Sequence, residues 1–146
     1  MVDRDLLLEK LTNLRRCLER MQPRLRMAPD HFLKDLDARD IVFHNLELAA
    51  QACVDAGAHI LADEGWGVAG KQVEIFEILV QHGVIPPAVG DGMIDLVRFR
   101  NELVHTYAKV NIVREFRALP GRVKTLVGFG QAVTGRFRLG GRRTRR

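Results

Sequence analysis

An arginine, a histidine and a tyrosine lie within the stretch RNELVHTY, which begins at Arg100. The imidazole of His105 has a proton that moves near neutral pH, so it can act as a general acid or base. Arg100 keeps its charge and holds a phosphate with a rigid fork of N–H donors. The stretch therefore carries the groups needed for phosphodiester chemistry, with the phenol of Tyr107 beside them.

The helix predicted for this stretch sets a geometric condition on that chemistry. At about 100° per residue, Arg100, Val104 and Tyr107 share one apolar stripe, whereas His105 lies about 140° away from Arg100. One regular helix cannot direct both groups at a single phosphate. We expect either a distorted turn between them or a second subunit.

Each of these residues also has an ordinary structural explanation. Arg100 can pair with Glu102 or another acid, His105 can be a surface residue, and Tyr107 can belong to the core. Arginine on an otherwise apolar stripe is the hardest to explain in this way, because a charge there needs a partner or a role. The residues alone leave both interpretations open.

Apolar residues recur at spacings of three and four along most of the chain, which is the pattern of amphipathic helices. The fold class predicted is all-α, an up-and-down bundle of about five helices. The first expected helix starts after Asp3 as its N-cap, and the next two cover about 37–62 and 71–82. A fourth helix starts at Pro86 and Pro87 and includes RNELVHTY. A further helical segment starts at Asn111, is interrupted at Pro120 and ends near Gly135.

Length and charge divide the chain into two parts. Its 146 residues suit one domain, and residues 136–146 hold six arginines and no acid, so removing them from the total of +5 leaves −1 for residues 1–135. We predict a helical domain over 1–135 and a disordered arginine-rich tail over 136–146, because a like-charged segment with adjacent glycines buries too little apolar area to become ordered.

The cysteines and the apolar runs bear on the compartment. Cys17 and Cys53 lie on apolar helical stripes without a spacing for zinc or redox chemistry, so we predict buried thiols. The N-terminus lacks the pattern of a secretory signal, and no apolar run approaches the ~20 residues that span a bilayer. These features predict a cytoplasmic protein without a membrane partner.

Two further patterns of polar residues predict neither a metal site nor a second catalytic site. The five histidines do not form a metal-ligand pattern, so we predict no metal and no cofactor (His31, His44, His59, His82 and His105). The central helix carries a polar side that is more typical of a solvated or interface face than of a catalytic site (Asn45, Glu47, Gln51, Asp55 and His59).

Three blocks of the sequence, in order, resemble one family. RFRNELVHTYAKV resembles the R-x4-H-x-Y signature of HepT-type toxins in the HEPN superfamily, with Arg100, His105 and Tyr107 at the named positions. IVFHNLELAAQACVDAGAHILAD resembles the central helix of that family, and EIFEILVQHGVIPP its next helix. The resemblance covers about residues 1–134, and it departs from the family at WGVAGKQ (66–72) and in the tail.

The resemblance implies a HEPN-like bundle that pairs as a homodimer, with both signatures facing a shared cleft. It also implies a metal-independent endoribonuclease in which the RNA 2′-hydroxyl attacks the adjacent phosphate. In that mechanism His105 moves the proton, Arg100 stabilises the charge that develops on the phosphate oxygens, and Asn101 orients the substrate or His105.

The resemblance further implies one half of a toxin–antitoxin pair. The partner is a minimal nucleotidyltransferase antitoxin of the MntA type, which adenylylates the signature tyrosine, here Tyr107. A bulky anionic AMP group beside Arg100 and His105 blocks the phosphate site. The implied partners are therefore RNA, this antitoxin and a second copy of the chain.

Two other functions stay open at this point. One is a non-catalytic helical binding module that partners a minimal nucleotidyltransferase. The other is a binder of nucleic acid or of a membrane surface that acts through residues 136–146. Metal-free RNA cleavage that is lost in His105→Ala separates the enzyme from the first alternative, and deletion of the tail separates it from the second.

Overall fold

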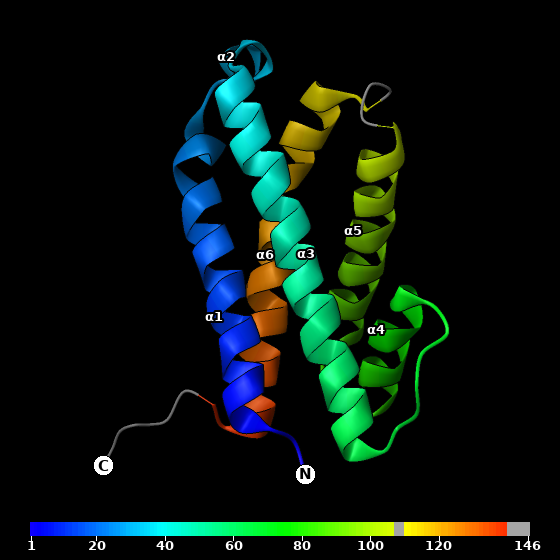
Figure 1. Cartoon of the computed structure of the whole chain (residues 1–146). Coiled ribbons are helices and arrows are strands. Elements are labelled where there is room, and N and C mark those ends of the chain that lie inside the picture. Colours follow the sequence, from blue (N-terminus) through cyan, green and yellow to red (C-terminus); the bar gives the residue numbers. More distant parts are fainter. Residues whose placement is uncertain (107–109, 140–146) are drawn as a thin grey trace, which may run out of the picture.

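The computed structural model describes residues 1–106 and 110–139, and the secondary structure of this part is entirely helical (Figure 1). The predicted all-α class is confirmed, with six α-helices and one 3-10 helix in place of about five helices. Their bounds are α1 Arg4–Met21, η1 Gln22–Arg26, α2 Pro29–Lys34, α3 Leu36–Glu64, α4 Gln72–Gln81, α5 Pro87–Thr106 and α6 Ile112–Phe137.

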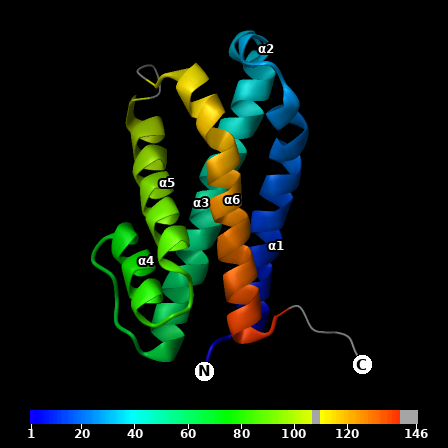
Figure 2. The ribbon, with the colours of Figure 1, turned by 180° about the vertical axis from the view of Figure 1, so that it is seen from behind.

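The long helices α1, α3, α5 and α6 run side by side in alternating directions, which is the up-and-down arrangement that the sequence predicts (Figure 1). The short α2 lies across one end of the bundle, and α4 packs along α5 and the second half of α3. The N-terminus and the end of α6 lie at the opposite end from α2. The end of α5 and the start of α6 both lie at the α2 end of the bundle (Figure 2).

Local sequence signals explain where several helices begin and end. The Asp3 carboxylate accepts a hydrogen bond from the Leu6 amide at 3.1 Å, and Asn111 Oδ1 accepts one from Arg114 at 3.0 Å. Both predicted N-caps are confirmed, since a side-chain oxygen satisfies an otherwise unpaired amide of the first turn. Gly83 follows α4 with a φ of +71°, the left-handed conformation that glycine adopts most easily.

The helix α2 was not predicted from the sequence. It spans six residues, yet its Phe32 is fully buried and stacks on Phe116 with ring centroids 4.2 Å apart. The ring of Phe43 meets it edge-on at 5.9 Å. This aromatic contact ties α2 to α3 and α6 at the end of the bundle where α5 also ends.

The predicted interruption at Pro120 is wrong, because α6 continues through this residue to Phe137. Pro120 is exposed, whereas its neighbour Leu119 and the later Leu126 are fully buried. Proline removes one backbone hydrogen bond from a helix interior. Here the buried apolar face on both sides of the proline offsets that cost.

The predicted domain boundary at residue 135 falls inside α6, which ends at Phe137, and Leu139 still packs against the core. Residues 140–146 of the predicted tail lie outside the described residues. Every helix in the described part of the chain is too short or too polar to span a bilayer.

Candidate functional site

Arg100 lies two-thirds of the way along α5 and turns toward the start of α4. Its Nη1 donates a long hydrogen bond of 3.4 Å to Oε1 of Gln72, the first residue of α4. Its Nε is buried and has no hydrogen-bond partner among the described residues. A half-buried guanidinium is thus held by one weak contact to a neutral amide, and part of its donor capacity is unused.

The ordinary explanation for Arg100 was a carboxylate partner. The ion pairs within residues 1–106 and 110–139 involve Lys10, Arg114 and Arg122, and none of them involves Arg100. A charge taken partly out of water without an opposite charge is costly unless an anion joins it. The position of Arg100 therefore favours a ligand over a structural pair.

His105 and Asn101 lie on the exposed side of the same helix. His105 occupies the last turn of α5, which is one uninterrupted α-helix through Thr106. The distorted turn that we offered as one solution to the angular conflict is therefore absent from residues 100–105. Within one chain, Arg100 faces α4 while His105 faces solvent, and Tyr107 lies outside the described residues.

The helical spacing predicted that Val104 lies on the buried stripe, and this prediction is wrong. Its side chain is 57% exposed, whereas Leu103 is buried. The reason is that α4 begins at Gln72, beside Arg100, so that the last part of α5 extends beyond α4 (Figure 1). Val104, one helical turn after Arg100, is consequently uncovered. Gln72 belongs to no motif, and no sequence pattern indicated that it would contact Arg100.

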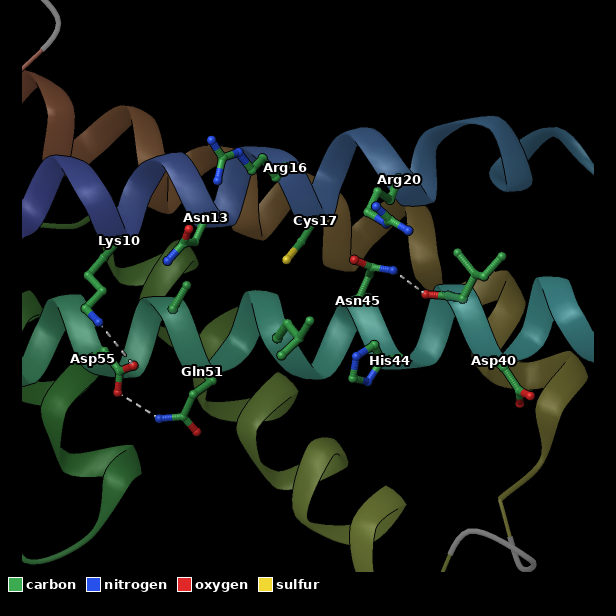
Figure 3. Close-up of a pocket in the computed structure, with 13 residues that line it drawn as sticks. Lys10, Asn13, Arg16, Cys17, Arg20, Asp40, His44, Asn45, Gln51 and Asp55 are labelled. Carbon is green, nitrogen blue, oxygen red and sulfur yellow. Dashed lines mark hydrogen bonds and ion pairs between the residues drawn. The ribbon is translucent and has the colours of Figure 1, made fainter.

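A groove of about 700 Å³ lies between α1 and α3, and Arg100 is not among the residues that line it (Figure 3). It contains Asn45, Gln51 and Asp55 from the predicted polar side of the central helix. These groups mostly satisfy one another or the backbone: Gln51 donates to Asp55 at 2.8 Å, Asp55 faces Lys10 at 3.9 Å, and Asn45 donates to the Ile41 carbonyl at 2.7 Å. These contacts give the three side chains structural partners within the fold.

The cysteines are buried, as predicted. Burial raises the pKa of the Cys53 thiol, and the neighbouring Cys17 adds to the increase. Burial also raises the pKa of Cys17, although Arg20 opposes the shift. Both groups are therefore in the unreactive thiol form at neutral pH. Within the described part of the chain, no cluster of three or more His, Cys, Asp or Glu side chains is placed to hold a metal ion.

The fold and the helix α5, which carries the signature residues Arg100 and His105, define a class: an all-helical protein with an arginine that lacks a carboxylate partner and an exposed histidine on one helix. The model of the ribonuclease HepT-like family matches residues 14–132, and the chain belongs to this family. The match confirms the resemblance read from the three sequence blocks.

One curated relative and several solved structures are similar to this chain. The mRNA nuclease HepT of Shewanella oneidensis is 28% identical over 108 residues, which cover 74% of this chain and 80% of that protein. The fold is shared with the solved structure of a tri-AMPylated Shewanella oneidensis HEPN toxin in complex with an MNT antitoxin, at a TM-score of 0.82 and 24% identity over 92% of this chain and 99% of that one. The cytosolic protein YutE of Bacillus subtilis, of unknown function, is also similar, at a TM-score of 0.78 and 18% identity over 93% and 91% of the two chains.

Proposed function

We propose that this chain is a metal-independent endoribonuclease, the toxin of a cytoplasmic toxin–antitoxin pair, and that Arg100 and His105 are its catalytic residues. The observation that carries the proposal is the half-buried guanidinium of Arg100, which has an unused donor and no carboxylate partner, on the helix that presents His105 to solvent. Membership in the ribonuclease HepT-like family supports an RNA phosphate as the anion that Arg100 binds.

The proposed reaction needs only the RNA and these side chains. The 2′-oxygen forms a bond to the adjacent phosphorus while the bond from phosphorus to the 5′-oxygen breaks, which leaves a 2′,3′-cyclic phosphate and a 5′-hydroxyl. A proton leaves the 2′-hydroxyl and another joins the 5′-oxygen, and His105 is placed to move one of them. Arg100 stabilises the charge on the phosphate oxygens, and the exposed amide of Asn101 orients the substrate or His105.

We further propose that the working unit is a homodimer in which Arg100 and His105 of different chains face one phosphate. The uninterrupted α5 supports this arrangement, since it directs the two side chains of one chain to different sides. The exposed Val104 beside Arg100 offers apolar surface for a second copy.

The proposed antitoxin is a minimal nucleotidyltransferase of the MntA type that silences the toxin by adenylylating Tyr107. The support is the AMPylated state and the MNT partner named for the Shewanella toxin that shares this fold. Co-expression with such an enzyme should add the mass of one or more AMP groups to the peptide that contains Tyr107. An unmodified peptide would contradict this part of the proposal.

The test of the enzyme is RNA cleavage by the purified protein in the presence of EDTA. His105→Ala and Arg100→Ala should each reduce the rate by at least about 100-fold. His31→Ala is the matched control, because His31 is also an exposed helical histidine but lies on α2. Equal rates for the parent and His105→Ala would rule out His105 as a catalytic residue, and a parent protein that cleaves no RNA would leave the non-catalytic binding module as the function.

Mixing the two inactive variants tests the shared site. A dimer built from one Arg100→Ala chain and one His105→Ala chain keeps one intact composite site out of two. Because half of the dimers in a random equimolar mixture are mixed, about a quarter of the parent activity should return. No recovery after unfolding and refolding the mixture would show that each chain uses its own pair.

A further inference from the structure

A cluster of charged side chains joins α5 to α6, two helices that pack against each other (Figure 2). Glu115, on the first turn of α6, is only 4% exposed. Its Oε1 accepts a hydrogen bond from Arg122 Nη2 at 3.0 Å, and its Oε2 accepts two from Arg114 at 3.1 and 3.2 Å. A carboxylate that is buried in this way fixes the side chains that neutralise it.

Arg122 extends this buried pair across to α5. Its Nη1 donates to Asp95 Oδ2 at 3.1 Å, and the guanidinium carbon lies 4.5 Å from the centroid of the Phe99 ring. The side chain of Arg122 is only 12% exposed. Since Asp95 and Phe99 are one helical turn apart, one guanidinium holds two points on the same face of α5.

Phe99 is the residue directly before Arg100. Neighbouring residues of a helix point about 100° apart, so fixing the Phe99 ring against α6 sets the direction of Arg100 toward α4 and places Asn101 on the outer side. The same rotation of α5 sets the direction of His105 one and a half turns later. The orientation of the whole signature helix is thus coupled to the contact between Arg122 and Phe99.

We infer that Arg122 is a positioning residue for the signature: held by Glu115, it clamps α5 to α6 through Asp95 and Phe99 and so directs Arg100 and His105. The inference rests on the proposed function for its effect on RNA cleavage. It does not rest on that function for its effect on α5 itself. Arg122 takes no part in the chemistry, because its hydrogen bonds already join it to two carboxylates.

The kinetic test compares Arg122→Gln, Arg122→Lys and Asp95→Asn with the parent protein. Arg122→Gln should lower kcat by about tenfold or more with KM changed less than about twofold, since misplacing catalytic groups by a fraction of an ångström slows the chemical step. Arg122→Lys restores a cation and should recover part of kcat. Asp95→Asn removes only the ion pair between Arg122 and Asp95, at a side chain that is 75% exposed, so it tests this contact with little effect on the stability of the fold.

The matched control is Val133→Ala, which removes packing from a fully buried position on α6 without touching the clamp. This variant should lower the melting temperature but leave kcat within about twofold when assayed below that temperature. An equal loss of kcat in Val133→Ala, or a folded Arg122→Gln protein with the parent kcat, would overturn the inference and leave the cluster a purely stabilising one.

Amide hydrogen exchange supplies a readout that does not depend on RNA cleavage. In Arg122→Gln and in Asp95→Asn, the amides of residues 96–106 should exchange faster, whereas the first half of α5 keeps its protection. If the parent protein cleaves no RNA, the proposed function fails while this measurement still tests the clamp. Unchanged exchange over residues 96–106 in Arg122→Gln would refute the clamp even in an active enzyme.

Discussion

Replacing Arg100 by methionine should stabilise the folded protein while it abolishes RNA cleavage. The buried Nε without a partner is expected to cost about 1–3 kcal/mol, and the long 3.4 Å bond to Gln72 returns about 0.5 kcal/mol or less. Methionine keeps the apolar stem and needs no hydrogen bonds. The balance is a gain of about 0.5–2 kcal/mol in the free energy of unfolding, or about 2–7 °C in Tm for a chain of this length.

The same substitution at Arg122 is the matched comparison and should have the opposite sign. Arg122 also has a buried Nε without a partner, but it donates to two carboxylates at 3.0 and 3.1 Å. Methionine there leaves the buried Glu115 with Arg114 alone, which should cost about 3–5 kcal/mol. The two substitutions are thus predicted to change the free energy of unfolding in opposite directions, because only Arg122 has carboxylate partners that balance its charge.

Thermal unfolding followed by circular dichroism, at several protein concentrations because the Tm of an oligomer depends on concentration, measures both effects. Tm should rise in Arg100→Met and fall in Arg122→Met. A fall of more than about 2 °C in Arg100→Met would refute the reasoning, because it would show that the guanidinium is already satisfied in the folded protein.

Three further outcomes follow from packing, burial and charge. Gly57→Ala should lower the free energy of unfolding by about 1–3 kcal/mol, because the new Cβ would lie 2.4 Å from a side chain of α4. Gly121→Ala has open space around the new Cβ, so it should raise the free energy of unfolding by about 0.5–1 kcal/mol. Urea unfolding measures both changes. Because the pKa values of Cys17 and Cys53 are raised, the thiolate fraction is small at pH 8, and neither thiol should react with a disulfide reagent until the protein is unfolded or the pH is raised further. Removing residues 140–146 deletes four arginines, so RNA cleavage should persist while the slope of log KM against log salt falls by up to about 3.

Most of the fold could be predicted from local patterns. The long helices have apolar residues at helical spacing over several turns, and Asp3 and Asn111 are cap residues that act on their own first turn. The exceptions depend on contacts distant in sequence: α2 is too short to show a period and is held by the stack of Phe32 on Phe116, and α6 continues past Pro120 because its inner face is buried. Such contacts leave no signal in a window of a few residues.

The candidate site was predictable in its residue types but not in its surroundings. The types and spacing of Arg100 and His105 predicted phosphodiester chemistry. The angle between them predicted that one regular helix cannot direct both side chains at one phosphate. The sequence did not predict that α4 would begin beside Arg100, which leaves Val104 uncovered. Glu115 and Arg122 were missed, although a usable signal was present: they are charged residues on the apolar stripe of a helix, the criterion that had singled out Arg100.

The unused donor of Arg100 also bears on how silencing would work. In the proposed off-state, an AMP phosphate on the signature tyrosine supplies the anion that Arg100 lacks, so the modification should stabilise the fold as well as block the site. The adenylylated protein should therefore melt above the unmodified protein, and Arg100→Met should remove most of that increase. If Arg100→Met keeps the increase in melting temperature, the AMP phosphate is bound by a group other than Arg100. The AMP group would then block the site by its bulk alone.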